Sequence, residues 1–405
     1  MITSNFNIEN NILSIIKKDN FYFNISKKFN QIFSELKNEL NNKNKTINIL
    51  DKKFSLNFKI SELQKFKKFK KIAIIGMGGS ILGSEAIYNF LEKRVKKKIY
   101  FLNNINEKKI ITLKKKEKLS EVLFIIISKS GNTIETISNA LSLKIFKKKA
   151  KNIIIISEKK NSDLFNLAKK LKLKYIEHKK NIGGRYSVLS EVGIVPAYLM
   201  GLNISKLRSN LLNFFTGSEK LFLKDSSINL SSIFKNKKFN NIIFLNYYPE
   251  LESFLFWLQQ LLGESLGKKN KGFLPMISNV PKDHHSLLQL YLDGPKDKLF
   301  YIFSNEIKAQ SKIKLKNSKL VSNALNNKSL SQIKRAQKKA LIKAFKIKKI
   351  PFRLFEIKKN NEMVLGSLFS YFILETIMIG KLNDVNPFDQ PAVEQIKNLT
   401  KKFLS

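Results

Sequence analysis

The sequence of 405 residues contains no cysteine and only three histidines. Without cysteine the chain can form neither a disulfide framework nor a thiolate metal site, and it has no thiol nucleophile. Three histidines also leave little room for a zinc site. These absences exclude disulfide-stabilised scaffolds and thiol enzymes.

No secretory signal is expected at the N-terminus. Residues 1–26, MITSNFNIENNILSIIKKDNFYFNIS, lack a basic start followed by a long apolar stretch and a small-residue cleavage site. The longest apolar segment, VLGSLFSYFILETIMIG at 364–380, includes Glu375, two serines and a tyrosine, which suits a buried helix better than a membrane span. We therefore expect a cytoplasmic protein without a membrane-spanning segment.

The charge balance is strongly positive, with 75 Lys and Arg against 31 Asp and Glu and a formal net charge of +44. Such a charge normally suggests a nucleic-acid partner. Here the lysines are spread along the whole chain beside abundant Asn and Ile, which is the pattern expected of A+T-rich codons, and no basic block joins a nucleic-acid motif. We predict no specific nucleic-acid partner, although the surface should attract anionic substrates within about 10 Å.

Six short apolar runs alternate with helix-like segments, and 43% hydrophobic content supports real cores. The runs lie in two blocks, at 71–76, 122–128 and 152–157, and at 241–246, 298–304 and 351–357. This alternation favours parallel sheets covered on both faces, so we predict two doubly wound α/β domains with flanking helices. The expected divisions are an N-terminal helical segment, two α/β domains and a C-terminal helical segment, at 1–45, 46–205, 206–370 and 371–405.

Two small-residue turns follow strands of the first block. SKSGNTIET at 128–136 follows an apolar run and reads as a helix start, because hydroxyl residues precede Glu135. A strand, such a turn and a helix N-terminus form an anion site by geometry. IGMGGSILG at 75–83 is close to a dinucleotide pattern, but Ile81 stands where the third glycine belongs, so alone it is weak evidence. In a parallel sheet both turns can emerge at the carboxyl edge, where ligands bind.

Two further segments carry candidate catalytic groups. NIGGRYSVLSEVG at 181–193 places Arg185 after two glycines, where it can point at an anion or a developing oxyanion. QQLLGESLGK at 259–268 sets Glu264 near the end of a helix, facing the negative end of the helix dipole, which suits it to proton transfer. Considered singly, each residue is more typical of a surface side chain.

Histidines and a C-terminal helix add the remaining candidates. DHHSLLQLYLDG at 283–294 supplies His284 and His285, either of which can act as acid or base near neutral pH, although adjacent loop histidines are often only solvated. FDQPAVEQIK at 388–397 offers Gln390, and also Lys397 three residues after an acidic residue on one helix face. The simpler interpretation of that last pair is a surface ion pair worth a few tenths of a kcal/mol.

Together and in this order, these motifs resemble the glucose-6-phosphate isomerase family over about residues 70–397. GGRYSVLSEVG and NPFDQPAVEQIK resemble the two signature stretches of that family, and GMGGSILG, SKSGNTIET, GESLGK and DHHS fill the expected places between them. Two positions differ: Ala392 stands where the family usually has glycine, and His284 where it often has glutamine.

The resemblance implies two sugar-isomerase domains that interconvert glucose 6-phosphate and fructose 6-phosphate, in glycolysis and gluconeogenesis, without metal or cofactor. It implies that Glu264 moves a proton between carbons 1 and 2 while Arg185 stabilises the cis-enediolate. His285 would help open the sugar ring, Lys397 would contact the ring or a nearby oxygen, and Gln390 would complete the pocket. The implied phosphate-binding residues are Gly79, Ser80, Ser128, Lys129, Ser130 and Thr133.

The same resemblance implies a homodimer in which the histidine reaches into the neighbouring subunit's site. Three alternatives remain. A dual phosphoglucose and phosphomannose isomerase is disfavoured by Gln390, and a non-catalytic sugar-phosphate sensor has no need for Glu264, Arg185 and His285 together. The third alternative is charge-driven binding of nucleic acid, which salt would abolish.

Overall fold

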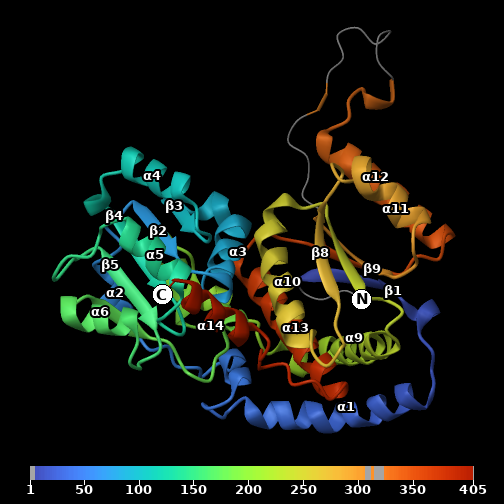
Figure 1. Cartoon of the computed structure of the whole chain (residues 1–405). Coiled ribbons are helices and arrows are strands. Elements are labelled where there is room, and N and C mark those ends of the chain that lie inside the picture. Colours follow the sequence, from blue (N-terminus) through green and yellow to red (C-terminus); the bar gives the residue numbers. More distant parts are fainter. Residues whose placement is uncertain (1–4, 306–311, 314–322, 405) are drawn as a thin grey trace.

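Apolar runs form the central strands of two five-stranded sheets, one in each half of the molecule (Figure 1). The computed structural model describes residues 5–305, 312–313 and 323–404. The first sheet has the order β3-β2-β4-β5-β6, and all its strands are parallel. Its strands are β2 (Lys71–Ile75), β3 (Lys98–Leu102), β4 (Val122–Ile127), β5 (Ile153–Ser157) and β6 (Lys174–Glu177).

Helices cover both faces of this sheet. Side chains alternate along each strand, so that Ile125 joins one buried cluster and Phe124 and Ile126 join the other. Such two-sided burial requires the nearly continuous apolar runs found in the sequence. The helices of this half are α2 (Ile60–Gln64), α3 (Leu82–Leu91), α4 (Glu107–Lys116), α5 (Ile134–Ser142), α6 (Asp163–Leu171), α7 (Glu191–Met200) and α8 (Ile204–Leu207).

The second sheet has the order β1-β10-β9-β7-β8. Its parallel strands are β7 (Asn241–Asn246), β8 (Leu274–Asn279), β9 (Lys298–Asn305) and β10 (Phe352–Ile357). Its helices are α9 (Gly217–Asn236), α10 (Glu252–Leu266), α11 (His284–Asp293), α12 (Leu330–Ile347) and α13 (Glu362–Leu382). The predicted fold class, α/β with two sheets of mainly parallel strands, is confirmed.

The N-terminal segment corrects one expectation. Residues 1–45 were expected to be helical, and α1 (Asn20–Glu39) is, but β1 (Phe6–Asn11) is a strand that pairs antiparallel with β10, with Phe6 opposite Ile357. Phe6 and Ile8 are buried at alternate positions, so the strand closes the edge of the second sheet. The second sheet is therefore mixed rather than wholly parallel.

The apolar segment at 364–380 lies in α13, at the centre of the second half. Among the described residues α13 is the one helix long and apolar enough to cross a membrane, and 94% of that stretch is buried inside the protein. The expected boundary between residues 370 and 371 falls within this continuous helix.

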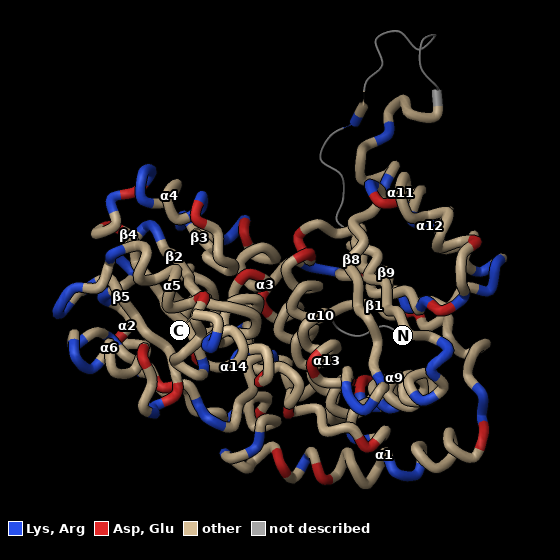
Figure 2. Tube along the Cα trace, viewed as in Figure 1, with Lys and Arg blue, Asp and Glu red and all other residues tan. Residues whose placement is uncertain are grey.

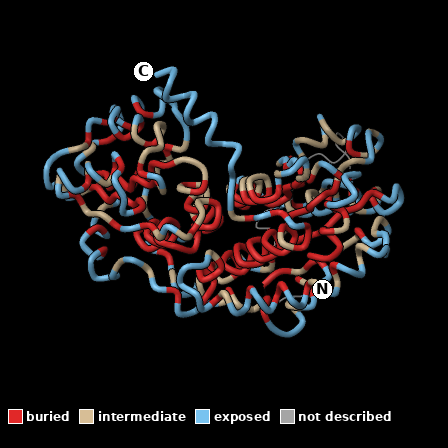
Figure 3. The backbone as a smooth tube through the Cα atoms, turned by 60° about the horizontal axis from the view of Figure 1, so that its bottom comes forward, coloured by how far each residue is buried: buried red, intermediate tan, exposed pale blue. Residues whose placement is uncertain are grey.

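The positive charge is spread over the whole chain, as the sequence predicts. Lys and Arg are scattered over both halves rather than gathered in one block (Figure 2). The C-terminal helix α14 (Val393–Leu404) differs from the others, because none of its residues is buried (Figure 3).

Candidate functional site

The two small-residue turns lie next to each other at the carboxyl edge of the first sheet, as predicted. Their strands, β2 and β4, are hydrogen-bonded neighbours. Gly76 lies so close to the end of β4 that a Cβ atom there would be 3.0 Å from the carbonyl oxygen of Ile127. The two turns therefore form one continuous polar edge.

Gly79 brings this edge against the segment that carries Arg185. A Cβ atom on Gly79 would lie 2.2 Å from the carbonyl carbon of Gly184 and 2.6 Å from the backbone nitrogen of Arg185. Ser187 also donates a hydrogen bond to the Gly79 carbonyl, at 3.2 Å. Only glycine fits here, because the peptide group between Gly184 and Arg185 occupies the space of a side chain.

The Arg185 side chain is buried, with 2% of its surface exposed, and its position is set by five hydrogen bonds. Nε donates to Ser265 at 2.8 Å, and Nη2 donates to the carbonyls of Pro387 at 2.7 Å and Asp389 at 3.0 Å. Nη1 donates to Gln390 Oε1 at 2.9 Å and to Glu264 Oε2 at 3.2 Å. A guanidinium presents its donors in a fixed planar fork, so these partners determine its orientation.

Glu264 lies in the last turn of α10 and meets Arg185 there. Its Oε2 accepts from Arg185, and its Oε1 accepts from Gln260 Nε2 at 2.9 Å. The side chain is 31% exposed, so the carboxylate remains reachable from outside. A carboxylate held beside a fixed cation can accept a proton from a bound molecule whose developing negative charge the cation faces.

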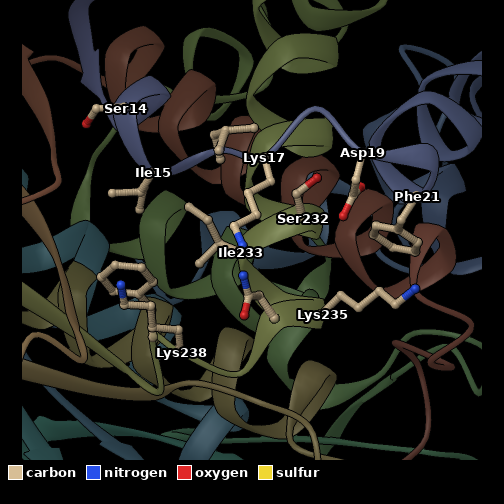
Figure 4. Close-up of a pocket in the computed structure, with 12 residues that line it drawn as sticks. Ser14, Ile15, Lys17, Asp19, Phe21, Ser232, Ile233, Lys235 and Lys238 are labelled. Carbon is tan, nitrogen blue, oxygen red and sulfur yellow. The ribbon is translucent and has the colours of Figure 1, made fainter.

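Glu264 and Gln390 line a cavity of about 990 Å³. The loop between α10 and β8, the end of α9 and the start of α14 form its walls. A separate hollow of about 520 Å³, between the N-terminal segment and α9, contains none of the predicted site residues (Figure 4). Figure 4 shows Lys235 and Lys238 of that hollow pointing in opposite directions, so these two charges do not converge on one ligand.

The hydroxyl groups of the second turn form a small cluster. Ser128 Oγ lies 2.8 Å from Thr133 Oγ1, and Ser130 Oγ lies 3.5 Å from Ser128 and 3.4 Å from Thr133. Gly131 has a φ of +71°, and a Cβ there would be 2.2 Å from Ser162 Oγ. The turn is thus wound tightly, and three hydroxyls converge at the N-terminus of α5.

Lys129 belongs to the same turn, but its side chain points elsewhere. Its ammonium donates to the carbonyl oxygen of Lys180 at 2.9 Å and lies 3.6 Å from Glu158 Oε1. Burial lowers the pKa of Lys129, an effect that Glu158 opposes. We expected Lys129 to hold an anion, but its ammonium points toward the Lys180 carbonyl and Glu158 instead.

The two adjacent histidines differ in their surroundings. His284 Nε2 lies 3.1 Å from Tyr247 Oη, and burial lowers its pKa, whereas His285 is exposed. Their helix, α11, packs with α12 on one face of the second sheet, where Tyr291 and Phe345 both contact Phe300. The buried aromatic residues of α10, Phe254 and Trp257, belong to the cluster on the other face. His285 is therefore not brought to Glu264 of the same chain.

Lys397 lies on the exposed helix α14, and its ammonium binds Glu394 at 2.6 Å. This is the surface ion pair that the spacing predicts. No described contact joins Lys397 to Arg185 or Glu264.

Several functional neighbours were missed by sequence reasoning. Gln260 lies one helical turn before Glu264, a spacing that could have indicated the contact. Ser265 and the carbonyls of Pro387 and Asp389 lie far from Arg185 in sequence, and no local signal links them. Among the described residues, no group of three or more His, Cys, Asp or Glu side chains is arranged to hold a metal ion.

Comparison with known proteins places this site in a family. Residues 27–405 match the family model described as Phosphoglucose isomerase. A glucose-6-phosphate isomerase from Methanocaldococcus jannaschii is 31% identical over 362 residues, covering 83% of this chain and 86% of the relative. A glucose-6-phosphate isomerase from Campylobacter jejuni is 31% identical over 376 residues, covering 89% and 90%.

Solved structures show the same fold. A hypothetical protein from Thermus thermophilus superposes with a TM-score of 0.82 at 22% identity, over 99% of this chain and 100% of that chain. A glucose-6-phosphate isomerase from Chlamydia trachomatis superposes with a TM-score of 0.68 at 19% identity, over 84% and 71%. From the match over residues 27–405 and from relatives at 31% identity, the chain belongs to the phosphoglucose isomerase family.

Proposed function

We propose that this protein interconverts glucose 6-phosphate and fructose 6-phosphate, as an aldose–ketose isomerase of glycolysis and gluconeogenesis. The observation that carries the proposal is the pair formed by Arg185 Nη1 and Glu264 Oε2, 3.2 Å apart, beside the cavity of about 990 Å³. Family membership and the names of the relatives support the same reaction.

Isomerisation needs one group that moves a proton and one that stabilises an oxyanion. In the open-chain sugar, the Glu264 carboxylate removes the proton from carbon 2 of the aldose and returns it to carbon 1. The electron pair released forms a cis-enediolate, whose negative oxygen on carbon 1 faces the Arg185 guanidinium. As carbon 1 takes up the proton from Glu264, the hydroxyl proton on oxygen 2 passes to oxygen 1, which leaves the carbonyl group at carbon 2. Five hydrogen bonds orient this cation and use all five of its N–H donors, so the oxyanion would take the place of Gln390 Oε1 or Glu264 Oε2 on Nη1. Gln390 borders the same pocket and would contact the substrate.

The hydroxyl cluster of the second turn would bind the phosphate, which does not react. Ser128, Ser130 and Thr133 offer O–H donors, and backbone N–H groups at the start of α5 add further donors. Gly79 and Ser80 of the neighbouring turn would lie beside the phosphate. The net charge of +44 favours the approach of an anionic substrate.

His285 and Lys397 would reach the substrate only if parts of the chain move or if a second chain supplies them. We propose a homodimer in which His285 enters the site of the partner and assists ring opening, while Lys397 contacts the ring or a nearby oxygen. The exposed position of His285 supports this role, as do exposed apolar residues on the edge strand β8 and on α14. These residues are Leu274, Met276, Ile396, Leu399 and Phe403.

The family resemblance also supports a reaction without metal or cofactor and a cytoplasmic location. We further propose the division into two sugar-isomerase domains at 46–205 and 206–370, flanked by 1–45 and 371–405. The location of β2–β6 in the first and β7–β10 in the second supports this division, with β1 added from the first flank.

The test is a coupled assay that converts fructose 6-phosphate to glucose 6-phosphate, with purified protein and added chelator. Glu264→Gln should lower kcat by about 10²- to 10⁴-fold, because the proton-transfer group is lost. Exchange of the hydrogen at carbon 2 with solvent should be lost as well, while substrate still binds. Glu107→Gln, at an exposed position on α4, is the matched control and should leave kcat unchanged. Near-normal turnover by Glu264→Gln would rule out the mechanism.

A further inference from the structure

Lys129 connects the phosphate loop to the segment that leads to Arg185. Its backbone belongs to residues 128–133, but its ammonium donates to the carbonyl of Lys180, at 2.9 Å. Lys180 lies five residues before Arg185 in the sequence. One side chain therefore spans two parts of the site that are distant in sequence.

Glu158 holds this ammonium in place. Its backbone N–H donates to the Lys129 carbonyl at 3.0 Å, and its Oε1 lies 3.6 Å from the Lys129 ammonium. The other oxygen, Oε2, binds Lys160 at 2.8 Å. Only 9% of Glu158 is exposed, so burial leaves its carboxylate little freedom to turn.

His178 contributes a neutral neighbour to this arrangement. Its backbone N–H donates to the Ser157 carbonyl at 2.8 Å, and its side chain is buried. Burial, helped by the charge of Lys129, lowers the pKa of His178 to about 4. The imidazole is therefore uncharged near pH 7 and puts no second positive charge against Lys129.

We propose that Lys129 and Glu158 are positioning residues that set the geometry between the phosphate loop and Arg185. The ammonium of Lys129, the carboxylate of Glu158 and the carbonyl of Lys180 form what we call the Lys129 bridge. This bridge keeps a fixed distance between the loop that binds phosphate and the segment that carries the guanidinium. The inference rests on the proposed isomerase function.

The bridge also explains how phosphate can be bound without the Lys129 ammonium. An ammonium has three donors, of which one is used by the Lys180 carbonyl and another faces Glu158. Its charge is partly neutralised by that buried carboxylate. The hydroxyls of Ser128, Ser130 and Thr133 and nearby backbone N–H groups remain available for the anion.

The experiment compares catalysis with phosphate binding in a set of variants of the full chain. Lys129→Met keeps the length of the side chain but removes the ammonium, Lys129→Arg restores a donor to the Lys180 carbonyl, and Glu158→Gln weakens the hold on the ammonium. Lys160→Met is the matched control, because it removes a half-exposed cation from the same carboxylate without touching the bridge to Lys180. The readouts are kcat and KM for fructose 6-phosphate and the Kd of inorganic phosphate.

We expect Lys129→Met to lower kcat by about 10- to 100-fold, because a small misplacement of Arg185 is costly. The Kd of inorganic phosphate should change by less than about threefold, since the hydroxyl loop persists. Lys129→Arg should recover most of kcat, and Lys160→Met should match the wild type. The double variant Lys129→Met with Glu158→Gln should be no worse than Lys129→Met alone, because the two residues act as one unit.

Two results would overturn the inference. Tenfold weaker binding of phosphate by Lys129→Met with kcat unchanged would make the ammonium a direct phosphate ligand. A lower Tm with unchanged kcat and KM would leave the bridge a purely structural contact. Inactive wild-type protein would instead refute the proposed function, and the phosphate Kd of Lys129→Met would still show whether the ammonium binds phosphate.

Discussion

Adding a single methyl group at Gly79 should push its turn away from the segment that carries Arg185. In Gly79→Ala the new Cβ would lie 2.2 Å from the carbonyl carbon of Gly184, 2.3 Å from its oxygen and 2.6 Å from the nitrogen of Arg185. All three are backbone atoms, so no side-chain rotation can relieve the contact. Carbon atoms rest about 3.5 to 4.0 Å apart, and the two segments must therefore move apart by more than about 1 Å.

This displacement predicts a large effect on catalysis and a smaller one on stability. Moving a catalytic group by about 1 Å can cost about 10²-fold in rate, and Arg185 directly follows the displaced Gly184. Forcing an extra methyl into a packed region typically costs about 1 to 3 kcal/mol. We expect kcat of Gly79→Ala to fall by about 10²-fold while the protein still folds.

Gly263→Ala is the matched control for this substitution. Gly263 directly precedes Glu264, but a Cβ there meets nothing within 4 Å. Within a helix, alanine is also favoured over glycine by about 1 kcal/mol. Steady-state kinetics and urea unfolding of both variants test the argument. A kcat of Gly79→Ala within threefold of the wild type would show that the close packing of these turns does not set the position of Arg185.

Two further predictions concern the partner subunit and pH. If His285 serves the neighbouring site, inactive Glu264→Gln chains and inactive His285→Ala chains that are unfolded, mixed and refolded together should regain about a quarter of wild-type activity. Half of the dimers are then mixed, and each mixed dimer has one intact site. No recovery would place His285 within its own chain's site. Burial lowers the pKa of His178 from 6.5 to about 4, so the folded protein binds fewer protons than the unfolded chain and loses stability as pH falls below 6.5. Between pH 7.5 and 5 the free energy of unfolding, measured by urea denaturation, should drop by about 2 kcal/mol more in the wild type than in His178→Gln. An equal drop in the two proteins would contradict a neutral buried imidazole.

The strands that could be predicted are the central ones. The six apolar runs correspond to β2, β4 and β5 in the first sheet and to β7, β9 and β10 in the second. The four strands that were missed, β1, β3, β6 and β8, are all at the edges of the sheets. Edge strands are paired on one side only and are partly exposed, so β1, β6 and β8 carry polar residues, or proline as at Pro275, and lack a continuous apolar run. The fourth, β3, has the apolar run IYFL at 99–102 and could have been predicted.

The candidate site shows the same division between local and long-range information. The turns at 76–80 and 128–133 were predictable, because their small and hydroxyl residues determine local backbone geometry. The meeting of Arg185 with Glu264 could be expected only by resemblance, because each residue alone is typical of a surface. The donation from Arg185 to the carbonyl of Pro387 could not be predicted at all, since it depends on how the C-terminal segment packs.

The sequence by itself determined the chemistry available to this protein, namely no thiol, few histidines, glycine and hydroxyl turns after apolar strands, and an ordered set of motifs. It did so because composition and local turn geometry depend on neighbouring residues. Only the tertiary structure decided which of these groups meet. It joined Arg185 to Glu264, turned Lys129 toward Lys180 and left His285 outside its own chain's site. These outcomes depend on contacts between residues far apart in the chain, where packing in three dimensions, rather than local preference, sets the distance.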